Sequence, residues 1–373
     1  MLGSFARACE LRPVLRVLGH GLLAIALTLC AGEALVRLTI AGPSPQVYDE
    51  EIGYTYAPHS QSFQAKEGMT RLRFNAYGLN DEDVLPKDGR CRVLAIGDSY
   101  TAALQLPQAQ NFTSVAEQLD KQLDVVNGGR DGLFLGDLHK VFNKLANDVK
   151  PDLVVYVVSK RAVEEDIHLS DFSVSVDPAS GTIRDAVMRV EGKEAVKQMF
   201  APILRESALA TRLAAQLQPT LVDTVRQIQG MRGWFASLDA KKTTRPVATA
   251  SKPSDEDVLS FVFQRLTQRG PAAILYMDAL TYLPNQKAQV ASLSKKAEDL
   301  ARKAAERAGI RFFNTSDYLI ESVERTGQPP YGFDNAVLPG GHLNYEGHRA
   351  VGKALVDLVH DMRSSLPAEC QAK

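Results

Sequence analysis

The feature that most constrains this chain is an apolar run that ends in a serine. Residues 93–96 read Val-Leu-Ala-Ile, and Gly97-Asp98-Ser99-Tyr100 follows directly. A short apolar run bounded by a turn signal is typical of a buried strand. Because ligands bind at the carboxyl ends of the strands in open α/β sheets, we expect Ser99 to lie at the functional edge of such a sheet.

Strands and helices are expected to alternate along most of the chain. The expected strands cover residues 92–97, 124–127, 153–158, 272–277 and 310–313. The expected helices cover residues 112–122, 133–147, 291–308 and 351–362. This alternation predicts an α/β fold with a doubly wound parallel sheet over residues 91–373.

The alternation of expected strands and helices is interrupted over about residues 160–260. Within this segment, residues 187–217 have a helical pattern, whereas residues 240–257 are rich in Lys, Thr, Ser and Pro and predict a solvated linker. We interpret the whole segment as a mainly helical insertion in the α/β domain rather than as an independent domain.

The N-terminal residues predict a membrane anchor. Basic residues precede the stretch 17–32, which carries no formally charged side chain. A bilayer span takes about 20 mostly apolar residues, so residues 34–40 would have to extend this stretch while Arg37 snorkels. A cleaved signal peptide is the alternative. We expect residues 1–41 to form a cytoplasmic arm and one transmembrane helix in the inner membrane, with all later residues outside the cytoplasm.

Composition narrows the remaining choices. The chain has 373 residues, a formal charge of -1 and no long run of either sign, which argues against nucleic-acid binding. Residues 42–90 are polar with scattered aromatics, and we expect an irregular lead-in there. Cys91 and Cys370 are both expected at the edge of the sheet away from Ser99, where they could pair in an oxidising compartment. Two unrelated thiols are the alternative.

Four blocks, taken in order, resemble the SGNH, or GDSL-type, hydrolases. They are the strand followed by Gly97-Asp98-Ser99, the turn Asn127-Gly128-Gly129-Arg130-Asp131-Gly132, the segment His342-Leu-Asn-Tyr-Glu-Gly-His348, and Phe74-Asn-Ala-Tyr-Gly-Leu-Asn-Asp81. The last block is similar to the lead-in of membrane-anchored bacterial members. The resemblance implies the flavodoxin-like SGNH hydrolase fold, cleavage of ester bonds, and neither a metal nor an organic cofactor.

The resemblance assigns a role to three residues. Ser99 is the expected nucleophile, with a helix N-cap as its alternative role. His342 matches the histidine that takes the serine proton, whereas His348 is expected to pack or cap within the last helix. The backbone N–H groups of Ser99 and Gly129 are the expected donors to the oxyanion that forms on the ester.

Two departures from the family pattern concern catalytic positions. Where the family carries an oxyanion-binding Asn after the third strand, this chain has Lys160 and Arg161, so a cation, with Lys160 as the candidate, is a potential substitute. The acid usually precedes the histidine by two or three residues, but those positions hold Gly340 and Pro339. Asp334 is the candidate acid, and the alternatives are a turn role for Asp334 and a dyad oriented by a backbone carbonyl.

These features together predict an extracytoplasmic serine ester hydrolase of SGNH type. By resemblance, it would be an O-acyl or O-acetyl esterase or acyltransferase acting on a cell-envelope or exported polysaccharide. The expected partners are an acylated glycan, the membrane and proteins of polysaccharide export or modification. The alternative is a catalytically degenerate protein of the same fold that binds glycans or assists assembly. A phosphate-binding loop at residues 97–101 ranks last, because the loop is poor in glycine.

Overall fold

The computed structural model describes most of the chain. The described residues are 3–39, 45–49, 51–64, 67–168, 172–177, 180–188, 206–210, 213, 253–268, 270–282, 288–290, 292–336 and 340–371. The chain divides into two compact units, Met1–Pro45 with Gln198–Arg245, and Gln46–Lys197 with Pro246–Lys373. The second unit contains the sheet and all the candidate site residues.

In the first unit, one long helix carries the apolar N-terminal stretch. Helix α1 (Gly3–Thr39) is continuous, and its portion Arg16–Leu38 has a mean hydropathy of 1.8 over 23 residues. That portion is long and apolar enough to cross a membrane, a test that a signal sequence near the N-terminus also passes. Near its end, Arg37 pairs with Glu33 at 2.6 Å, which satisfies two charges within the helix.

The second unit is built on a five-stranded parallel sheet. Its strands are β5 (Cys91–Gly97), β6 (Leu123–Asn127), β7 (Leu153–Ser159), β10 (Ala272–Met277) and β13 (Arg311–Asn314). Their spatial order is β13-β10-β7-β5-β6, and every adjacent pair is parallel. This is the flavodoxin-like doubly wound order, whose switch point lies between β5 and β7. The predicted fold class is therefore confirmed.

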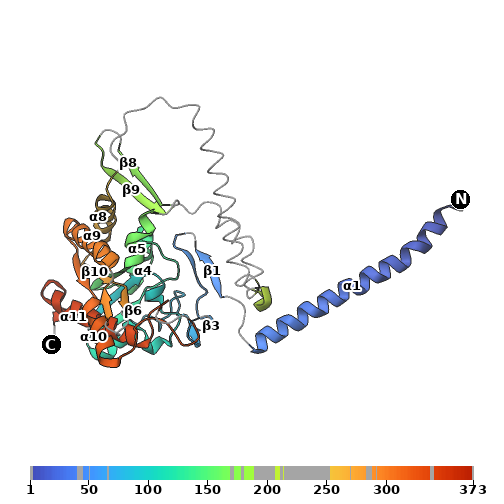
Figure 1. Ribbon diagram of the computed structural model, residues 1–373, viewed down its shortest axis with the longest axis horizontal. Helices are drawn as coiled ribbons and strands as arrows, with labels where there is room; N and C mark the ends of the chain where they lie inside the picture. Colours follow the sequence, from blue (N-terminus) through green and yellow to red (C-terminus); the bar gives the residue numbers. More distant parts are fainter. Residues whose placement is uncertain are drawn as a thin grey trace. The chain divides into compact units, whose positions relative to one another are not determined.

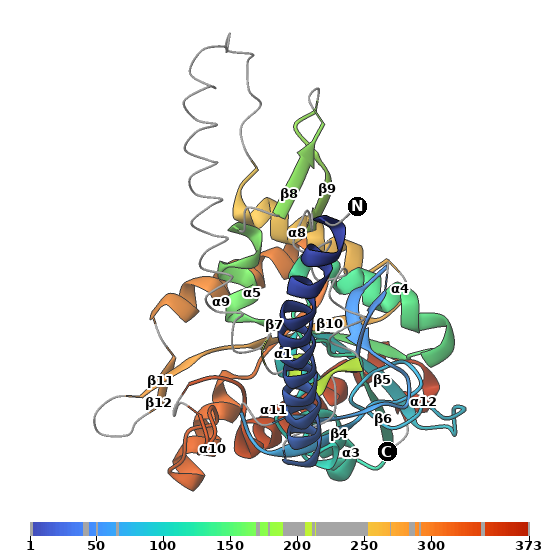
Figure 2. The same cartoon turned by 90° about the vertical axis from the view of Figure 1, so that its right-hand side faces the viewer.

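Helices cover both faces of this sheet (Figures 1 and 2). One face packs against α4 (Leu138–Val149), α5 (Lys160–Glu164), α8 (Asp255–Leu266) and α9 (Ser292–Ala308). The other packs against α3 (Phe112–Leu119), α10 (Ser316–Thr326), α11 (Tyr345–Met362) and α12 (Ala368–Gln371). All seven residues of β5 are buried, since alternate side chains enter the two cores. This explains why the strand is a continuous apolar run.

Two helices begin at different residues from those expected. Helix α11 begins at Tyr345 rather than at residue 351, because Asn344 caps it by accepting the Gly347 N–H at 3.2 Å. Helix α4 begins at Leu138 rather than at residue 133, and a loop with the short 3-10 helix η2 (Leu135–Asp137) precedes it.

The lead-in holds regular structure, contrary to the expectation of an irregular segment. It contains two antiparallel hairpins, β1 (Gln46–Asp49) with β2 (Gly53–Tyr56), and β3 (Gln61–Gln64) with β4 (Thr70–Arg73). Strands of four mostly polar residues show too short an alternation to be recognised in the sequence. The second hairpin adds its own small core, in which Leu72 and Phe74 pack with Ala102 and Leu104.

The insertion is described only in part. Residues 160–188 include α5, the 3-10 helix η3 (Asp166–His168) and a hairpin of β8 (Phe172–Val176) with β9 (Ile183–Met188). Most of the expected helix over 187–217 and most of the linker over 240–257 lie outside the described residues. A further hairpin, β11 (Leu280–Tyr282) with β12 (Ala288–Val290), follows β10.

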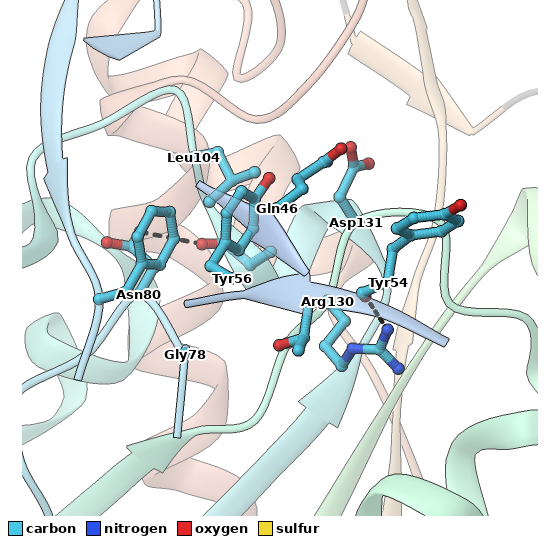
Figure 3. A pocket seen from close by; sticks show the side chains of 12 residues that line it. Gln46, Tyr54, Tyr56, Gly78, Asn80, Leu104, Arg130 and Asp131 are labelled. Carbon is cyan, nitrogen blue, oxygen red and sulfur yellow. Dashed lines mark hydrogen bonds between the residues drawn. The ribbon is translucent and has the colours of Figure 1, made fainter. Parts of the chain in front are cut away.

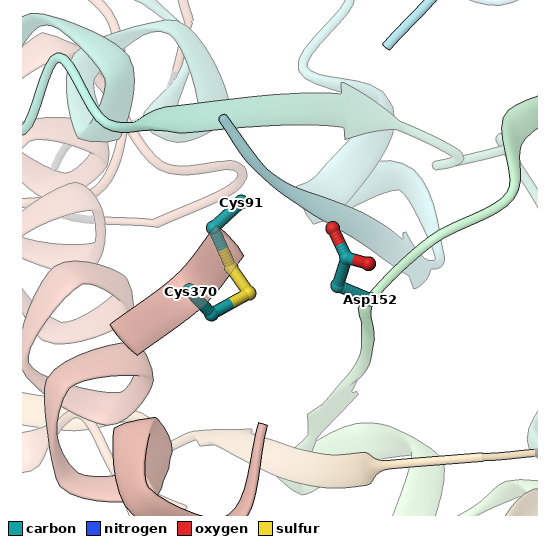
Figure 4. A group of neighbouring side chains, drawn as sticks. All are labelled: Cys91, Asp152 and Cys370. Carbon is teal, nitrogen blue, oxygen red and sulfur yellow. A yellow bond between two sulfur atoms is a disulfide. The ribbon is translucent and has the colours of Figure 1, made fainter. Parts of the chain in front are cut away.

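A disulfide closes the sheet domain at its amino edge (Figure 4). Cys91, the first residue of β5, is bonded to Cys370 of α12, so of the two alternatives the structure has the disulfide and not two unrelated thiols. Asp152 lies beside them and accepts the Arg92 N–H at 2.9 Å. These three side chains form the one group of potential metal ligands found among the described residues. Their two sulfurs are bonded to each other and so are not free to bind a metal.

Candidate active site

Ser99 lies at the carboxyl end of β5, on the first turn of the short helix α2 (Ser99–Ala102). The residue that caps this helix is Asp98, whose Oδ1 accepts the Tyr100 N–H at 3.0 Å. Because Asp98 performs the capping role, the Ser99 hydroxyl is not needed for it. The N-cap interpretation of Ser99 therefore does not hold, and its Oγ is directed to another partner.

That partner is His342. The Nε2 atom of His342 lies 2.9 Å from Ser99 Oγ. The histidine is held by its own segment, because its carbonyl accepts the Gly332 N–H at 2.9 Å and the next residue, Leu343, is fully buried. The ring also packs against Tyr100, with centroids 5.3 Å apart. Folding thus brings together the two residues that the sequence predicted as nucleophile and base.

The other ring nitrogen of His342 meets a carboxylate that the sequence interpretation missed. His342 Nδ1 is hydrogen-bonded to Glu67 Oε2, and the two side chains are 27% and 19% exposed. When the proton is on Nδ1, the ring donates to Glu67 and accepts from Ser99. The three side chains therefore form one continuous series of hydrogen bonds, with the polarity of a serine–histidine–acid triad.

The carboxylate hydrogen-bonded to His342 is that of Glu67 and not that of Asp334, which is exposed. The loop that carries Asp334 nevertheless helps to place Glu67. Its neighbour Asn335 accepts the Gly68 N–H and donates to the Gly68 carbonyl, both at 2.9 Å. Gly341 permits the close approach, since it has a φ of +90° and a Cβ there would lie 2.5 Å from Glu67 Oε1.

The lead-in is fastened to the loops of the sheet at several points (Figure 3). Asn80 donates to the carbonyls of Ala102 and Ala103, at 3.0 and 3.2 Å, at the end of α2. From the opposite direction, the guanidinium of Arg130 donates to the carbonyls of Ile52 and Tyr54 in the first hairpin. These contacts hold the lead-in, and with it the hairpin turn that bears Glu67, against the sheet.

The expected oxyanion donors have different surroundings. Within the described part of the chain, the Ser99 N–H has no hydrogen-bond acceptor. The Gly129 N–H, in contrast, already donates to Asn127 Oδ1 at 2.9 Å. Gly129 also packs tightly, because a Cβ there would lie 2.2 Å from the Ala102 nitrogen. The glycine is therefore explained by packing, and its N–H would have to exchange partners to bind an oxyanion.

The two cationic side chains that follow β7 have different partners. The Lys160 ammonium pairs with Glu164 of its own helix at 2.7 Å, so it is not the cation beside the nucleophile. Arg161 instead lies 3.8 Å from Asp98 and 3.7 Å from Asp166. The expectation for Lys160 is thus corrected, because the i,i+4 pairing draws its side chain along α5.

Burial shifts the pKa values of several groups in this part of the structure. Burial raises the pKa of Asp98 and raises that of Asp166 to about 6, while Arg161 favours the ionised form of both. Burial also raises the pKa of Tyr100 to about 12, so its hydroxyl stays protonated and donates to the Gly341 carbonyl at 3.3 Å.

His348 has the structural role that the sequence predicted. It is almost fully buried, and its Nδ1 accepts the Phe112 N–H at 3.1 Å. Burial lowers the pKa of His348 to about 3, which keeps the ring neutral. It joins α11 to α3 and takes no part in the triad.

Comparison with known proteins adds likenesses in structure only. No protein-family description and no curated sequence matches the chain. The solved structures that resemble it include GDSL-type lipolytic proteins and esterases. A lipolytic protein of the G-D-S-L family from Veillonella parvula is 10% identical with a TM-score of 0.35, covering 72% of this chain and 97% of its own.

Two esterases are similar to the same extent. An acetyl xylan esterase is 15% identical with a TM-score of 0.36, over 72% of this chain and 99% of its own. A carbohydrate acetylesterase from Sinorhizobium meliloti is 14% identical with a TM-score of 0.35, over 73% of this chain and 100% of its own. At these identities the activity of this chain has to be inferred from the strand order and from the geometry around Ser99.

Proposed function

We propose that this protein is a serine ester hydrolase of SGNH type, an O-acyl or O-acetyl esterase or acyltransferase. The observation that carries the proposal is the hydrogen-bonded series of Ser99, His342 and Glu67 at the switch point of a doubly wound sheet. It supplies the nucleophile, the base and the orienting carboxylate that acyl transfer through serine requires.

The reaction follows from the positions of the protons. His342 Nε2 takes the Ser99 proton while Oγ bonds to the carbonyl carbon of the ester, and Glu67 stabilises the imidazolium through Nδ1. The tetrahedral intermediate then breaks its bond to the alcohol, which leaves with the proton from His342. In the second half, water or a sugar hydroxyl gives its proton to His342 and attacks the acyl-enzyme. The bond between the acyl carbon and Oγ then breaks, and His342 returns the proton to Ser99.

The substrate in this proposal is an O-acylated polysaccharide of the cell envelope or one in export. The chain would be held in the inner membrane by α1, with the sheet domain outside the cytoplasm and proteins of polysaccharide export or modification as its partners. Two features support this location. Helix α1 has the length and hydropathy of a bilayer span, and the Cys91–Cys370 disulfide is typical of an oxidising compartment.

A glycan-binding or assembly protein without catalysis is the second candidate. Its basis was the lack of both an acid before His342 and an Asn after the third strand. Glu67 now supplies an acid, whereas Arg161 and Lys160 still occupy the region of the Asn. The lack of an Asn after the third strand is thus the one departure that still favours this candidate.

The decisive experiment compares the full-length protein in detergent with its Ser99→Ala variant. We expect the wild-type protein to hydrolyse an activated acetyl ester, and the variant to lose at least about 10⁴-fold in kcat. A fluorophosphonate probe should label the wild-type protein at Ser99 and leave the variant unlabelled. Equal rates for the two proteins, with no labelling, would contradict a hydrolase and favour the binding protein.

A further inference from the structure

The hairpin that carries Glu67 presents two arginines on its solvent face. Along β4, Thr70 and Leu72 are buried while Arg71 and Arg73 are exposed. This alternation arises because successive side chains of a strand point to opposite faces. One face of β4 therefore packs on the sheet domain, and the other presents two arginines to solvent.

The partner strand completes this face. In the antiparallel register, Arg71 lies opposite Phe63 and Arg73 lies opposite Gln61. Directly opposed residues share a face of the sheet. We call Gln61, Phe63, Arg71 and Arg73 the basic hairpin face. Gln61 is exposed and Phe63 is half-buried.

The two guanidinium groups have no counter-charge of their own. Among the described residues, neither Arg71 nor Arg73 makes an ion pair or a hydrogen bond through its side chain. Other exposed arginines of the described residues differ, as Arg90, Arg302 and Arg307 each pair with a carboxylate. Because the chain as a whole has a charge of -1, the positive potential at this face is local.

The chemistry of the face fits an acidic sugar polymer. A guanidinium binds a carboxylate through two parallel hydrogen bonds, and residues i and i+2 of a strand are roughly 7 Å apart. The ring of Phe63 offers an apolar surface to the C–H face of a sugar, and the Gln61 amide can bond to hydroxyls. Neutral polysaccharides would use the ring and the amide but leave both arginines without partners.

The face is tied to the catalytic residues through the hairpin itself. Glu67, in the turn between β3 and β4, is hydrogen-bonded to His342. On the opposite side of β4, Leu72 packs in one small core with Ala102 and Leu104, which follow Ser99 by only a few residues. A polymer bound along the basic hairpin face is therefore held by the same element that completes the triad.

We propose that the basic hairpin face binds an acidic, uronate-bearing polysaccharide. The inference rests on the proposed function, because it names the class of polysaccharide on which that site acts. The occupant is a polyanion recognised through its carboxylates and sugar rings together.

Binding by the full-length protein tests this inference without any need for turnover. The Ser99→Ala protein in detergent is titrated with sodium polygalacturonate, a polymer of uronate sugars, and with dextran, a neutral one. We expect polygalacturonate to bind and dextran to bind at least tenfold more weakly. Adding Arg71→Gln and Arg73→Gln should weaken polygalacturonate binding by tenfold or more and reduce its dependence on salt.

Charge-matched controls make the result specific. Lys121→Gln with Lys303→Gln removes two exposed positive charges away from the hairpin, and binding should stay within twofold. Arg71→Lys with Arg73→Lys keeps the charges but removes the planar fork, and binding should weaken by a smaller factor than for the Gln pair. Far-ultraviolet circular dichroism confirms that each variant is folded.

Three results would overturn the inference. They are unchanged binding by the Arg71→Gln, Arg73→Gln protein, equal binding of dextran, and binding of duplex DNA as tight as that of polygalacturonate. Failure of the proposed function appears elsewhere, as an absence of ester hydrolysis by the wild-type protein. The two failures are therefore told apart by different assays.

Discussion

Ser99 and His342 are held by the two large cores of the sheet, whereas Glu67 is held by a hairpin with a small core of its own. Ser99 follows β5, which is buried along its whole length, and His342 precedes the fully buried Leu343. Glu67 lies in a turn whose hairpin buries Leu72 against Ala102 and Leu104. Local openings have lower free energies where fewer apolar contacts are buried. The acid is thus the member of the triad that can be displaced while the sheet stays folded.

The largest expected effect tests the acid itself. We predict that Glu67→Gln lowers kcat for an activated acetyl ester by about 10³–10⁴-fold, because an amide does not stabilise the imidazolium of His342. The midpoint of thermal unfolding should stay within a few degrees, since the sheet cores are untouched. Stopped-assay kinetics and a melting curve on the same preparation measure both quantities.

Asp334→Asn is the matched control for this prediction. Asp334 is the exposed acid on the facing loop, so its substitution should leave kcat within about twofold. If Asp334→Asn lost as much activity as Glu67→Gln, or if Glu67→Gln lost less than about tenfold, the assignment of Glu67 as the acid would be wrong.

The same contrast explains which parts of the site could be predicted from sequence. Ser99 and His342 could be predicted because they lie within recognisable sequence blocks. A buried strand, a tight turn and a capped helix each impose residue types at fixed spacing. The five strands of the sheet were predicted to within one residue at each end, since continuous apolar runs leave little choice of register. The positions expected for strand and helix ends placed Cys91 and Cys370 at the same edge of the sheet, but the sequence left open whether they pair.

No comparable sequence pattern marks Glu67. It is one of 44 acidic residues, it lies 275 positions before His342, and no helix or buried strand surrounds it. The block from Phe74 to Asp81 was the nearest clue, because its Asn80 fastens the lead-in to α2. A motif that fixes a loop to the site suggests that the neighbouring loop takes part in it, but it does not say which residue does.

The second prediction concerns the disulfide at the amino edge of the sheet, opposite the edge that carries the triad. Replacing both Cys91 and Cys370 by Ala removes a cross-link between residues 279 positions apart. We expect the free energy of unfolding to fall by about 4 kcal/mol, because the unfolded chain gains conformational freedom. The kcat of the variant should stay within twofold of the wild-type value. Urea unfolding curves give the free energy of unfolding, and kinetics on the same preparation give kcat. A loss of kcat without a loss of stability would show that the two edges are coupled.

The third prediction concerns Asp166, a buried carboxylate 3.7 Å from Arg161. Burial raises the pKa of Asp166 to about 6, above its ordinary value of 3.8. A raised pKa means that the folded state binds the proton more tightly than the unfolded state does. The contribution of Asp166 to stability is therefore fully present below about pH 4 and is lost as the pH rises through about 6.

Asp166→Asn should accordingly change stability in a pH-dependent manner. At pH 4 the variant and the wild type should be equally stable, whereas at pH 7.5 the variant should be more stable by up to roughly 3 kcal/mol. The Leu135 N–H that bonds to Asp166 Oδ2 can still bond to an amide oxygen. Urea unfolding at both pH values measures the difference. A variant that is less stable at pH 7.5 would mean that the ion pair with Arg161 outweighs the burial.

The smallest expected effect probes how the hairpin is positioned. Asn335→Ala removes both hydrogen bonds to Gly68, beside Glu67, so the carboxylate should spend less time on His342. We expect kcat to fall by about tenfold, which corresponds to about 1.4 kcal/mol. In a Glu67→Gln background, the same substitution should have no further effect on kcat, since there is no carboxylate left to position. A full additional tenfold loss in that background would mean that Asn335 acts on Ser99 or His342 by another route, and the hairpin would then not be the element that places the acid.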